Sequence, residues 1–542
     1  MQLPSRSARG ARRARSILAA ATALVGALAV LLPASEAAAD VTIQRGFTGK
    51  VETLDPQKAS TAEEAAILVD MFDGLVTVDA LGRLVPGAAE SWTISPDGLV
   101  YTFKLREDGI WSNGEALKAA DFVASFRRLF DPATGATEDG PLQVIRGAIL
   151  IKQGLAKPET LGVKALDPLT LEITLEQPTP TFELRLAQPA ALPVFVASIK
   201  KLGADFGTTG KVVSNGAYRI GAVDRKDGYT LLKNPKFHAA DGVAADTVVY
   251  RPFAEAEDCL AAFEAKTVMV CSDVPTGDLG KLRAEVGPAL QIAPYEGTYF
   301  YAFNTAKKPF DDPRVRRALS MAIDREALAS EAWSGGMVPA ETLVPRDLSA
   351  RPQAPVAPIA ERRQKASALL AEAGFDPKKP GAKPLALTIR VGTGTAHEQT
   401  AKLIAEQWKD IGVEAKIVTE SNSDHYQRLR DGGDFDVARA GWILDEPDAV
   451  DMLTLLLSGN KRFNYARYAN AGYDEIVQDA EMELDPALRL KQIADAETVI
   501  ARDQPFMPLL GYASLSLVSP NLKGWQANVV NVHPSRFLSL AP

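Results

Sequence analysis

The sequence has few of the residues that usually carry metal or redox chemistry. It contains 2 cysteines and 4 histidines in 542 residues. Two cysteines exclude a disulfide-rich scaffold, an iron–sulfur protein and a cysteine-rich zinc module. His238, His397, His425 and His533 lie far apart in the sequence, and none has the spacing of a zinc-binding motif. We therefore expect neither a metal nor a cofactor.

Motifs of catalysis are also scarce. The sequence has no G-x-S-x-G nucleophile motif. Residues 198–201 match S-x-x-K, but the companion K-T-G is absent, and short matches arise by chance in a long chain. Residues 207–212 resemble part of a P-loop without its spacing or the Ser/Thr that follows the lysine. The sequence therefore indicates a protein that is not an enzyme.

The charge balance argues against nucleic acid as a partner. Lysine and arginine total 60 against 68 acidic residues, which gives a formal net charge of −8. A nucleic-acid-binding protein usually carries a basic patch instead. With 46% hydrophobic and 24% charged residues, the composition is that of a soluble globular protein. At about 150 residues per domain, the length corresponds to roughly three domains.

The N-terminus has the three parts of a secretory signal peptide. Arginines within 6–15 form a basic head, 17–32 carry no charge, and three alanines at 37–39 provide a small-residue exit. A membrane anchor is the alternative, but the apolar stretch is short and no second one follows. No cysteine follows it, so we expect no lipid anchor. We expect a signal peptide at 1–39 and a soluble periplasmic protein. Because Arg12 and Arg13 are adjacent, export by either the Sec or the twin-arginine route remains open.

Export would place Cys259 and Cys271 in an oxidising compartment, where they can pair. Cys259 opens a helix-like run at 259–266, and Cys271 ends a strand-like run at 267–271. The alternative is that both are small buried apolar side chains. The sequence does not give the Cα–Cα distance that a disulfide needs, so both interpretations remain open.

Hydrophobic periodicity alternates between strand and helix patterns. We expect strands at 100–105, 385–391 and 413–418, and helices at 121–130, 361–373 and 398–411. Strand, helix and strand over 385–418 are typical of a βαβ unit, which favours an α/β fold. The proline-rich segment 345–360 is expected to be a surface loop.

A series of short motifs follows a fixed order along the chain. It comprises TLDP (53–56), AESW (89–92), DG (97–98), YTFKLR (101–106), WSNG (111–114), ADFV (120–123), VSNGAY (213–218), KNP (233–235), Asn304, PF (309–310), RVR (314–316), AL (318–319), DR (324–325) and LLAEAG (369–374). In this order the sequence resembles the extracytoplasmic solute-binding proteins of ABC importers, in the peptide-binding family 5. The resemblance covers about 41–540.

The resemblance implies a two-lobed periplasmic-binding-protein fold of type II, with a hinge and an inserted third domain. The expected boundaries are 40–62, 193–296 and 513–542 for a discontinuous lobe I, 63–192 for the inserted domain and 297–512 for lobe II. A monomer would capture short peptides between the lobes. It would deliver them to an inner-membrane ABC permease that a cytoplasmic ATPase drives.

Segment 434–445 most resembles the oligopeptide-binding branch, in which it lines the ligand cleft. The likeness implies that Asp445 pairs with the peptide's α-amino group. Arg439 and Arg430 would face its carboxylate for one ligand length or another. These residue types suit a zwitterionic peptide, because a guanidinium can give a carboxylate two parallel hydrogen bonds.

Other parts of the expected site come from the same likeness. Gly441 and Trp442 would provide backbone and wall contacts, and Tyr295 to Tyr301 would be the aromatic segment that crosses between the lobes. Ala302 stands near where relatives often carry an acidic cleft residue, which leaves one polar contact in doubt. The signature residues Arg314, Arg316 and Asp324 are interpreted as structural ion pairs.

Several alternatives remain open from the residues alone. Asp445 shares an acidic cluster with Glu446, Asp448 and Asp451, which is also typical of a solvated loop. Arg439 has apolar neighbours, so it could instead form a structural ion pair with Asp445 or another carboxylate, and Trp442 could belong to the core. The solute could also be nickel, haem, glutathione, an opine or a sugar. A peptide sensor, a chaperone or a hydrolase is a further alternative.

Overall fold

The computed structural model describes residues 40–224, 228–352, 354–376, 379, 384–444 and 446–541. The chain divides into two units, Met1–Asp40 and Val41–Pro542. The predicted signal peptide at 1–39 lies outside the described residues. Within the described part of the chain, no helix has both the length and the apolar character needed to span a membrane.

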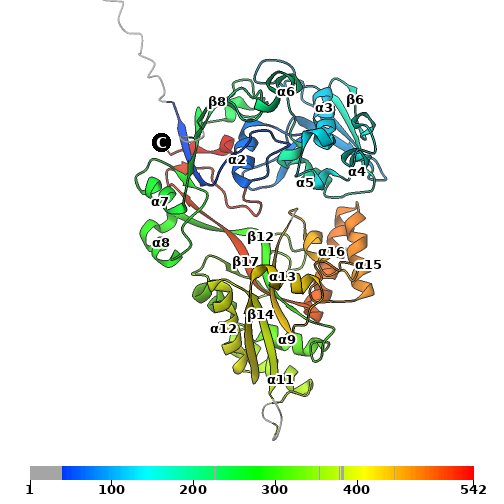
Figure 1. The fold of residues 1–542 in the computed structure, drawn as a ribbon, viewed down its shortest axis with the longest axis vertical. Coiled ribbons are helices and arrows are strands. Elements are labelled where there is room, and N and C mark those ends of the chain that lie inside the picture. Colours follow the sequence, from blue (N-terminus) through cyan, green and yellow to red (C-terminus); the bar gives the residue numbers. More distant parts are fainter. Residues whose placement is uncertain are drawn as a thin grey trace, which may run out of the picture. The chain divides into compact units, whose positions relative to one another are not determined.

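The largest element of the second unit is an 11-stranded mixed sheet (Figure 1). Its strand order is β15-β14-β16-β12-β17-β11-β1-β10-β9-β8, and β13 pairs with β17 outside this path. The strands are β1 (Thr42–Thr48), β8 (Tyr218–Asp224), β9 (Gly228–Lys233), β10 (Thr247–Phe253), β11 (Val270–Cys271), β12 (Leu290–Phe303), β13 (Val338–Pro339), β14 (Leu385–Gly392), β15 (Val413–Glu420), β16 (Val437–Ile443) and β17 (Phe506–Val518).

The long strands β12 and β17 connect the two ends of this sheet. They are antiparallel, from the pair Leu290 and Leu517 to the pair Ala302 and Phe506, with register shifts along the way. One shift lies between Pro294 and Thr298. β11 joins β17 on one side and β16 joins β12 on the other, so these two strands are shared by both ends.

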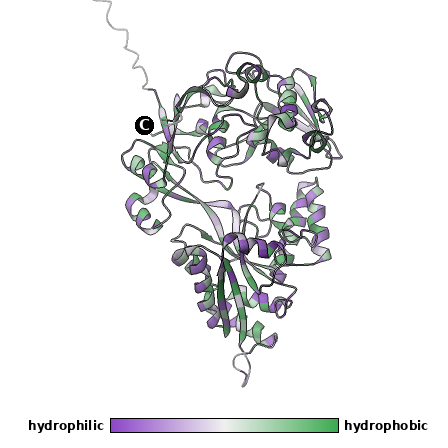
Figure 2. Cartoon of the chain, viewed as in Figure 1, coloured by the Kyte–Doolittle hydropathy of each residue, from purple (hydrophilic) through white to green (hydrophobic). Residues whose placement is uncertain are grey.

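The predicted βαβ unit is confirmed at the β15 end of the sheet. β14 and β15 are parallel, with Leu385 opposite Val413. Helix α12 (Thr395–Lys409) connects them and buries Ile404 and Trp408. Figure 2 shows hydrophobic residues concentrated on the strands of this region and hydrophilic residues on the flanking helices.

A separate antiparallel sheet forms in the N-terminal half, in the order β4-β5-β7-β6. Its strands are β4 (Ala89–Ile94), β5 (Val100–Leu105), β6 (Val163–Asp167) and β7 (Thr170–Thr174), beside a hairpin of β2 (Val76–Val78) and β3 (Leu84–Pro86). Helix α3 (Ala119–Phe130) contacts this sheet and buries Phe122 and Phe126. The expected strand 100–105 and helix 121–130 are therefore confirmed.

The remaining helices and two short strands surround these sheets. They are α2 (Ala62–Met71), α4 (Ala148–Lys152), α5 (Phe182–Leu186), α6 (Val196–Leu202), α7 (Ala256–Glu264), α8 (Leu279–Val286), α9 (Pro313–Met321), α10 (Arg325–Ala327), α11 (Ile359–Glu372), α13 (Asn422–Arg430), α14 (Ala449–Thr454), α15 (Ala471–Met482), α16 (Pro486–Asp503), β18 (Leu522–Lys523) and β19 (Ser539–Leu540). The expected helix 361–373 corresponds to α11.

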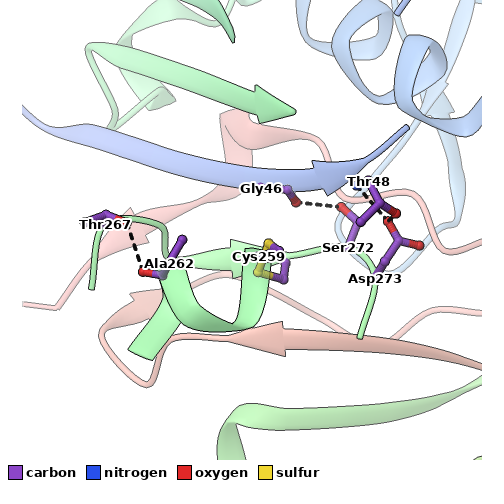
Figure 3. Close-up of a disulfide and its surroundings, with 8 residues drawn as sticks. Gly46, Thr48, Cys259, Ala262, Thr267, Ser272 and Asp273 are labelled. Carbon is purple, nitrogen blue, oxygen red and sulfur yellow. Dashed lines mark hydrogen bonds between the residues drawn. A yellow bond between two sulfur atoms is a disulfide. The ribbon is translucent and has the colours of Figure 1, made fainter. Parts of the chain in front are cut away.

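Cys259 and Cys271 form a disulfide between α7 and β11 (Figure 3). Their Cα atoms are 6.0 Å apart, which is within the usual range. A Cβ on Gly46 of β1 would lie 2.5 Å from the Cys259 sulfur, so only glycine lets β1 pass this close. The expected strand 267–271 is wrong in length. Thr267 still donates its backbone N–H to the Ala262 carbonyl, and only the last two residues join the sheet.

The signature residues form one of the expected ion pairs. Arg314 pairs with Asp312 at 2.7 Å. The expectation is wrong for Arg316, which is buried and donates to the backbone carbonyls of Phe310, Asp503 and Gln504. It is also wrong for Asp324, whose carboxylate accepts the Ala327 N–H and caps α10. In both cases the side chain forms hydrogen bonds with backbone groups near the ends of secondary-structure elements. These backbone groups would otherwise lack a hydrogen-bond partner.

Candidate functional site

Arg439 lies in the middle of β16, opposite Tyr301 of β12. Its side chain is buried, with 8% exposed. The guanidinium carbon lies 5.2 Å from the ring centroid of Tyr299 and 5.6 Å from that of Tyr426. Nη1 donates a hydrogen bond of 2.6 Å to the Tyr426 hydroxyl. Aromatic faces and a phenol therefore surround this cation.

Arg439 forms no ion pair with any carboxylate among the described residues. Its Nε–H is buried and has no hydrogen-bond partner there. Burying a charge without an opposite charge is costly. Arg316, which is also buried without an ion pair, uses its Nε–H on a backbone carbonyl, whereas the Nε–H of Arg439 remains unused. The alternative ion pair with Asp445 is untested, because Asp445 lies outside the described residues.

A histidine extends the surroundings of Arg439. His397 of α12 stacks on Tyr299 with ring centroids 5.6 Å apart and planes at 12°. Its Nδ1 is 3.3 Å from the Tyr299 hydroxyl. Burial, with smaller contributions from Arg439 and His425, lowers the pKa of His397 to about 4. The imidazole is therefore neutral at pH 7 and adds a hydrogen-bonding group without a second charge.

Gly441 and Trp442 follow on the same strand. A Cβ on Gly441 would collide with the Tyr512 hydroxyl, so a larger residue here requires the Tyr512 side chain to move. The Trp442 ring packs edge-on against Phe463, with centroids 4.7 Å apart. Its indole N–H is buried without a partner among the described residues. Trp442 therefore contacts the core and also keeps one unused donor.

The structure places Arg430 and Tyr295 further from Arg439. Arg430 is exposed at the end of α13 and lies near Tyr465, which packs against Tyr426 at 6.3 Å. Tyr295 is half-buried at the register shift of β12. Burial, followed by the neighbouring Glu296, raises the pKa of Tyr295. No contact between these two residues and Arg439 is present in the described part of the chain.

The acidic residues after Asp445 are held by arginines. Glu446 pairs with Arg185 of α5 at 2.8 Å, and burial raises the pKa of Glu446. Asp448 pairs with Arg489 at 2.8 Å and caps α14. The interpretation of this cluster as a solvated loop is therefore wrong for these two carboxylates.

Three of the residues around Arg439 were missed in the sequence, whereas Tyr299 lies within the expected aromatic segment Tyr295 to Tyr301. Tyr299 follows the period-two pattern of a strand, but Tyr426, Tyr512 and His397 come from a helix, a different strand and another helix. Nothing local marks them, because only the three-dimensional fold brings them together. Among the described residues, no group of three or more His, Cys, Asp or Glu side chains could hold a metal ion.

A cavity of about 270 Å³ lies elsewhere and contains none of the expected site residues. It is lined by Ile94, Tyr101, Pro180, Glu183, Glu483, Leu484, Pro486, Arg489, Leu490 and Ile493. These residues come from β4, β5, α5 and the proline before it on one side, and from the α15–α16 connection and α16 on the other. We assign it no ligand.

Comparison with known proteins decides the family. Residues 83–464 match the model for bacterial extracellular solute-binding proteins, family 5 (middle). The chain belongs to this family. The periplasmic oligopeptide-binding protein OppA of Escherichia coli K12 is a family 5 relative that is 33% identical over 94% of this chain and 95% of its own. The periplasmic murein peptide-binding protein MppA of the same organism is 33% identical over 88% of both chains.

Solved structures confirm the expected fold class for this family 5 protein. The unliganded open form of MppA, a periplasmic murein tripeptide binding protein, matches with a TM-score of 0.87 and 30% identity over 93% of this chain and 98% of that chain. Haemophilus influenzae OppA in complex with the peptide RPPGFSPFR gives 0.62 at 29% identity, with coverage of 93% and 99%. The fold is the two-lobed type II fold, and the family consists of binding proteins rather than enzymes.

Proposed function

We propose that this family 5 protein is the periplasmic substrate-binding protein of an ABC importer for short peptides. It captures a peptide as a monomer and delivers it to an inner-membrane permease that a cytoplasmic ATPase drives. The observation that carries the proposal is the buried guanidinium of Arg439, which has no carboxylate partner among the described residues. A ligand carboxylate would supply the missing charge.

The chemistry of a peptide fits this arrangement. A short peptide is a zwitterion, and a site that accepts many sequences must hold its two charged ends and its backbone. Arg439 takes the C-terminal carboxylate, with Tyr426 and neutral His397 beside it. We assign the α-amino group to Asp445. Each charge-assisted hydrogen bond in such a site contributes about 1.5–3 kcal/mol. Gly441 and Trp442 line the ligand backbone, and Tyr295 and Arg430 lie at the margins of the site.

We also propose the domain boundaries given above. Lobe I comprises 40–62, 193–296 and 513–542, the inserted domain 63–192, and lobe II 297–512. Separate hydrophobic cores support the boundary of lobe II: two cores lie within 299–510 and 300–506, whereas a single core within 47–250 spans both lobe I and the inserted domain. In the described part of the chain, β12 and β17 are the long strands that pass between these regions, so the register shift at Pro294–Thr298 is the proposed hinge.

The secretory segment belongs to the same proposal. Cleavage after Ala39 would release a soluble mature protein into the periplasm, without a lipid anchor. The disulfide between Cys259 and Cys271 supports an oxidising compartment. The two named relatives are periplasmic by their descriptions.

Calorimetric titration tests the proposed function. Mature protein from Asp40 onward is unfolded and refolded to remove bound ligand, and is then titrated with pools of di- to pentapeptides. We expect micromolar or tighter binding that weakens when the peptides are N-acetylated or C-amidated. Acetylation removes the charge assigned to Asp445, and amidation removes the charge assigned to Arg439.

The same experiment separates the alternatives. If no free, acetylated or amidated pool binds, the peptide proposal is wrong. Mass spectrometry of ligand that co-purifies with the protein then identifies another solute, such as glutathione, an opine, a sugar, haem or nickel. Recovery of cleaved peptide after titration would instead indicate a hydrolase. Tight binding without an associated permease would favour a sensor or chaperone.

A further inference from the structure

The proposed inserted domain contacts lobe II at a place outside the two long strands that join the lobes. Arg185 of α5 pairs with Glu446 at 2.8 Å, and both side chains are largely buried. The turn between β4 and β5 contacts the α15–α16 connection, because a Cβ on Gly98 would lie 2.6 Å from the Leu484 side chain. One charged and one apolar contact therefore connect these two regions independently of β12 and β17.

Both partners of the ion pair are anchored in their own region. Nη1 of Arg185 also donates a hydrogen bond of 3.0 Å to the Pro141 carbonyl of the inserted domain. On the other side, the Glu446 carbonyl accepts the Asp448 N–H, and Arg489 of α16 holds the Asp448 carboxylate with two hydrogen bonds of 2.8 Å. A pair whose side chains are already ordered loses less entropy when it forms, so it can restrain a movement between the regions.

The cavity of about 270 Å³ borders this contact and lies between two hydrophobic cores. Its wall residue Tyr101 belongs to the core within 47–250, whereas Ile493 belongs to the core within 300–506. Two further wall residues, Ile94 of β4 and Leu490 of α16, are 43% and 56% exposed. Single exposed leucines are common, but here large apolar side chains from both regions face one unfilled space. The contact is therefore only partly formed.

Rotation at the proposed hinge would move the two sides of this contact relative to each other. The inserted domain shares its core with lobe I, whereas α15 and α16 contribute to a core of lobe II. The structure matches the unliganded open form of MppA better than the peptide complex of OppA, so it shows the contact before closure. Closure that removes Ile94 and Leu490 from water is favoured by the hydrophobic effect.

We propose that this contact is a latch. In it, the Arg185–Glu446 pair limits how far the ligand-free protein opens, and the side chains of Ile94 and Leu490 pack together when the protein closes. The packing on closure rests on the proposed function, whereas the restraint of the free protein does not. A contact that forms only in the closed state favours that state without touching the peptide. The latch therefore slows the release of different peptides to a similar extent.

The distance between two spin labels tests the restraint in the ligand-free protein. Leu166→Cys and Asp479→Cys place one label on an exposed position of each region, since the two native cysteines are joined in a disulfide. We expect Arg185→Gln to shift the distance distribution to longer values and to broaden it. Arg428→Gln removes the same charge from a pair within lobe II, with Glu420, and should leave the distribution unchanged.

Reversal of the ion pair separates a specific contact from an effect of charge. Each single reversal, Arg185→Glu or Glu446→Arg, should broaden the distance distribution, and the double variant should restore that of the wild type. An unchanged distribution in Arg185→Gln would overturn the restraint. A double variant as broad as the single ones would assign the effect to charge alone and would also overturn it.

Peptide release tests the apolar part of the latch. Release of radiolabelled alanine tripeptide into an excess of unlabelled peptide is followed by rapid filtration. We expect threefold to tenfold faster release from Leu490→Gln and Ile94→Thr, because closure then buries less apolar surface. Leu488→Gln is the matched control, since Leu488 is 45% exposed on the same helix and is not among the described residues that border the cavity.

The specificity of binding supplies a second readout for the same variants. Leu490→Gln should weaken alanine tripeptide and its N-acetylated form by the same factor, because the latch does not contact the ligand. Urea unfolding should give the same midpoint for the wild type, Leu490→Gln and Leu488→Gln, since both side chains are exposed in the free protein. A changed ratio between the two peptides would assign Leu490 to the binding site and would overturn the latch.

The outcomes separate the latch from the proposed function. If the wild type binds peptide and Leu490→Gln releases it at the wild-type rate, the packing on closure is wrong and the peptide-binding function stands. If Leu488→Gln accelerates release as much as Leu490→Gln, the effect belongs to the helix surface in general and the packing is again wrong. If the wild type binds no peptide, the proposed function fails, and the label distances in the free protein alone decide whether Arg185 restrains it.

Discussion

Arg439 gives the sharpest test at the scale of a single residue. An arginine that serves a ligand and one that serves the fold respond differently to removal of the charge. Because Arg439 has no described carboxylate partner, Arg439→Met should leave the free energy of unfolding unchanged or slightly higher. Peptide affinity should fall about tenfold to a hundredfold, because one charge-assisted interaction is lost. Urea unfolding and calorimetry measure the two effects.

Arg316 is the matched control for this substitution. It is also buried, but its guanidinium satisfies the backbone carbonyls of Phe310, Asp503 and Gln504. Arg316→Met should therefore destabilise the protein by about 3 kcal/mol or more, because buried acceptors lose their donors. Its folded fraction should bind peptide normally. A large loss of stability in Arg439→Met would instead assign that residue to the fold.

Two buried ionisable groups should give opposite pH dependences. The pKa of His397 is lowered to about 4, chiefly by burial, so the unfolded chain takes up a proton first as pH falls below 6.5. His397 therefore lowers the free energy of unfolding progressively as pH falls from 6.5 to 4. Burial, followed by Asp451, raises the pKa of Glu296 to about 7. Glu296 costs stability above pH 7, and this cost disappears as pH falls towards 4.5.

Urea unfolding at pH 7.5 and pH 5 measures these two dependences. The free energy of unfolding of His397→Asn, relative to that of the wild type, should rise by about 1 kcal/mol between pH 7.5 and pH 5, after allowance for solvent screening. Glu296→Gln should have a higher free energy of unfolding than the wild type at pH 7.5. This advantage should fall by about 1 kcal/mol between pH 7.5 and pH 5. Shifts of the same sign in both variants would contradict the burial argument.

The sequence could predict only part of the candidate site. Arg439 stands between Val437-Ala438 and Ala440-Gly441, and this apolar setting correctly predicted a buried charge. It could not tell whether the partner was a carboxylate or an aromatic group. The rings of Tyr299 and Tyr426 come from different elements, so only the register of β12 against β16 and the position of α13 bring them together.

At the scale of elements, the disulfide should stabilise the fold without contributing to the site. Cys259 and Cys271 are separated by 12 residues and join α7 to β11. Loss of such a cross-link typically costs about 2–3 kcal/mol, since the unfolded chain gains freedom. Reduction of the wild type should lower its urea midpoint, whereas a Cys259→Ala/Cys271→Ala double variant should not respond to reductant. Peptide affinity at low temperature should be the same in all forms.

An unchanged urea midpoint after reduction of the wild type would contradict this stabilising role of the disulfide.

The same region shows why element boundaries are harder to predict than element types. The strand pattern at 267–271 was correct only at its end, because hydrogen bonds to Ala262 keep Thr267 and Val268 in the turn after α7. The long amphipathic helix α12 was predicted well, since its apolar positions repeat over several turns.

At the scale of the whole molecule, the question is whether binding closes the protein. The second unit matches the unliganded open form of MppA with a TM-score of 0.87 and a peptide complex of OppA with 0.62, at nearly equal coverage. We therefore expect that the free protein is open and that peptide favours a closed form, with rotation at Pro294–Thr298. The resemblance implied a hinge, but the sequence could not predict which form the free protein adopts, because both forms contain the same elements.

Small-angle scattering and thermal unfolding test this expectation together. At a peptide concentration of 100 times Kd, binding to the folded state alone adds about 2.7 kcal/mol to the free energy of unfolding. Hinge closure should in addition reduce the radius of gyration. At the same peptide concentration Arg439→Met, with its tenfold to hundredfold weaker binding, should gain only about 0.4–1.4 kcal/mol and should contract in proportion to its lower occupancy. Stabilisation without contraction would mean that peptide binds without hinge closure. Binding to the folded state is enough to raise the free energy of unfolding, whereas contraction requires that peptide bind the closed form more tightly than the open form.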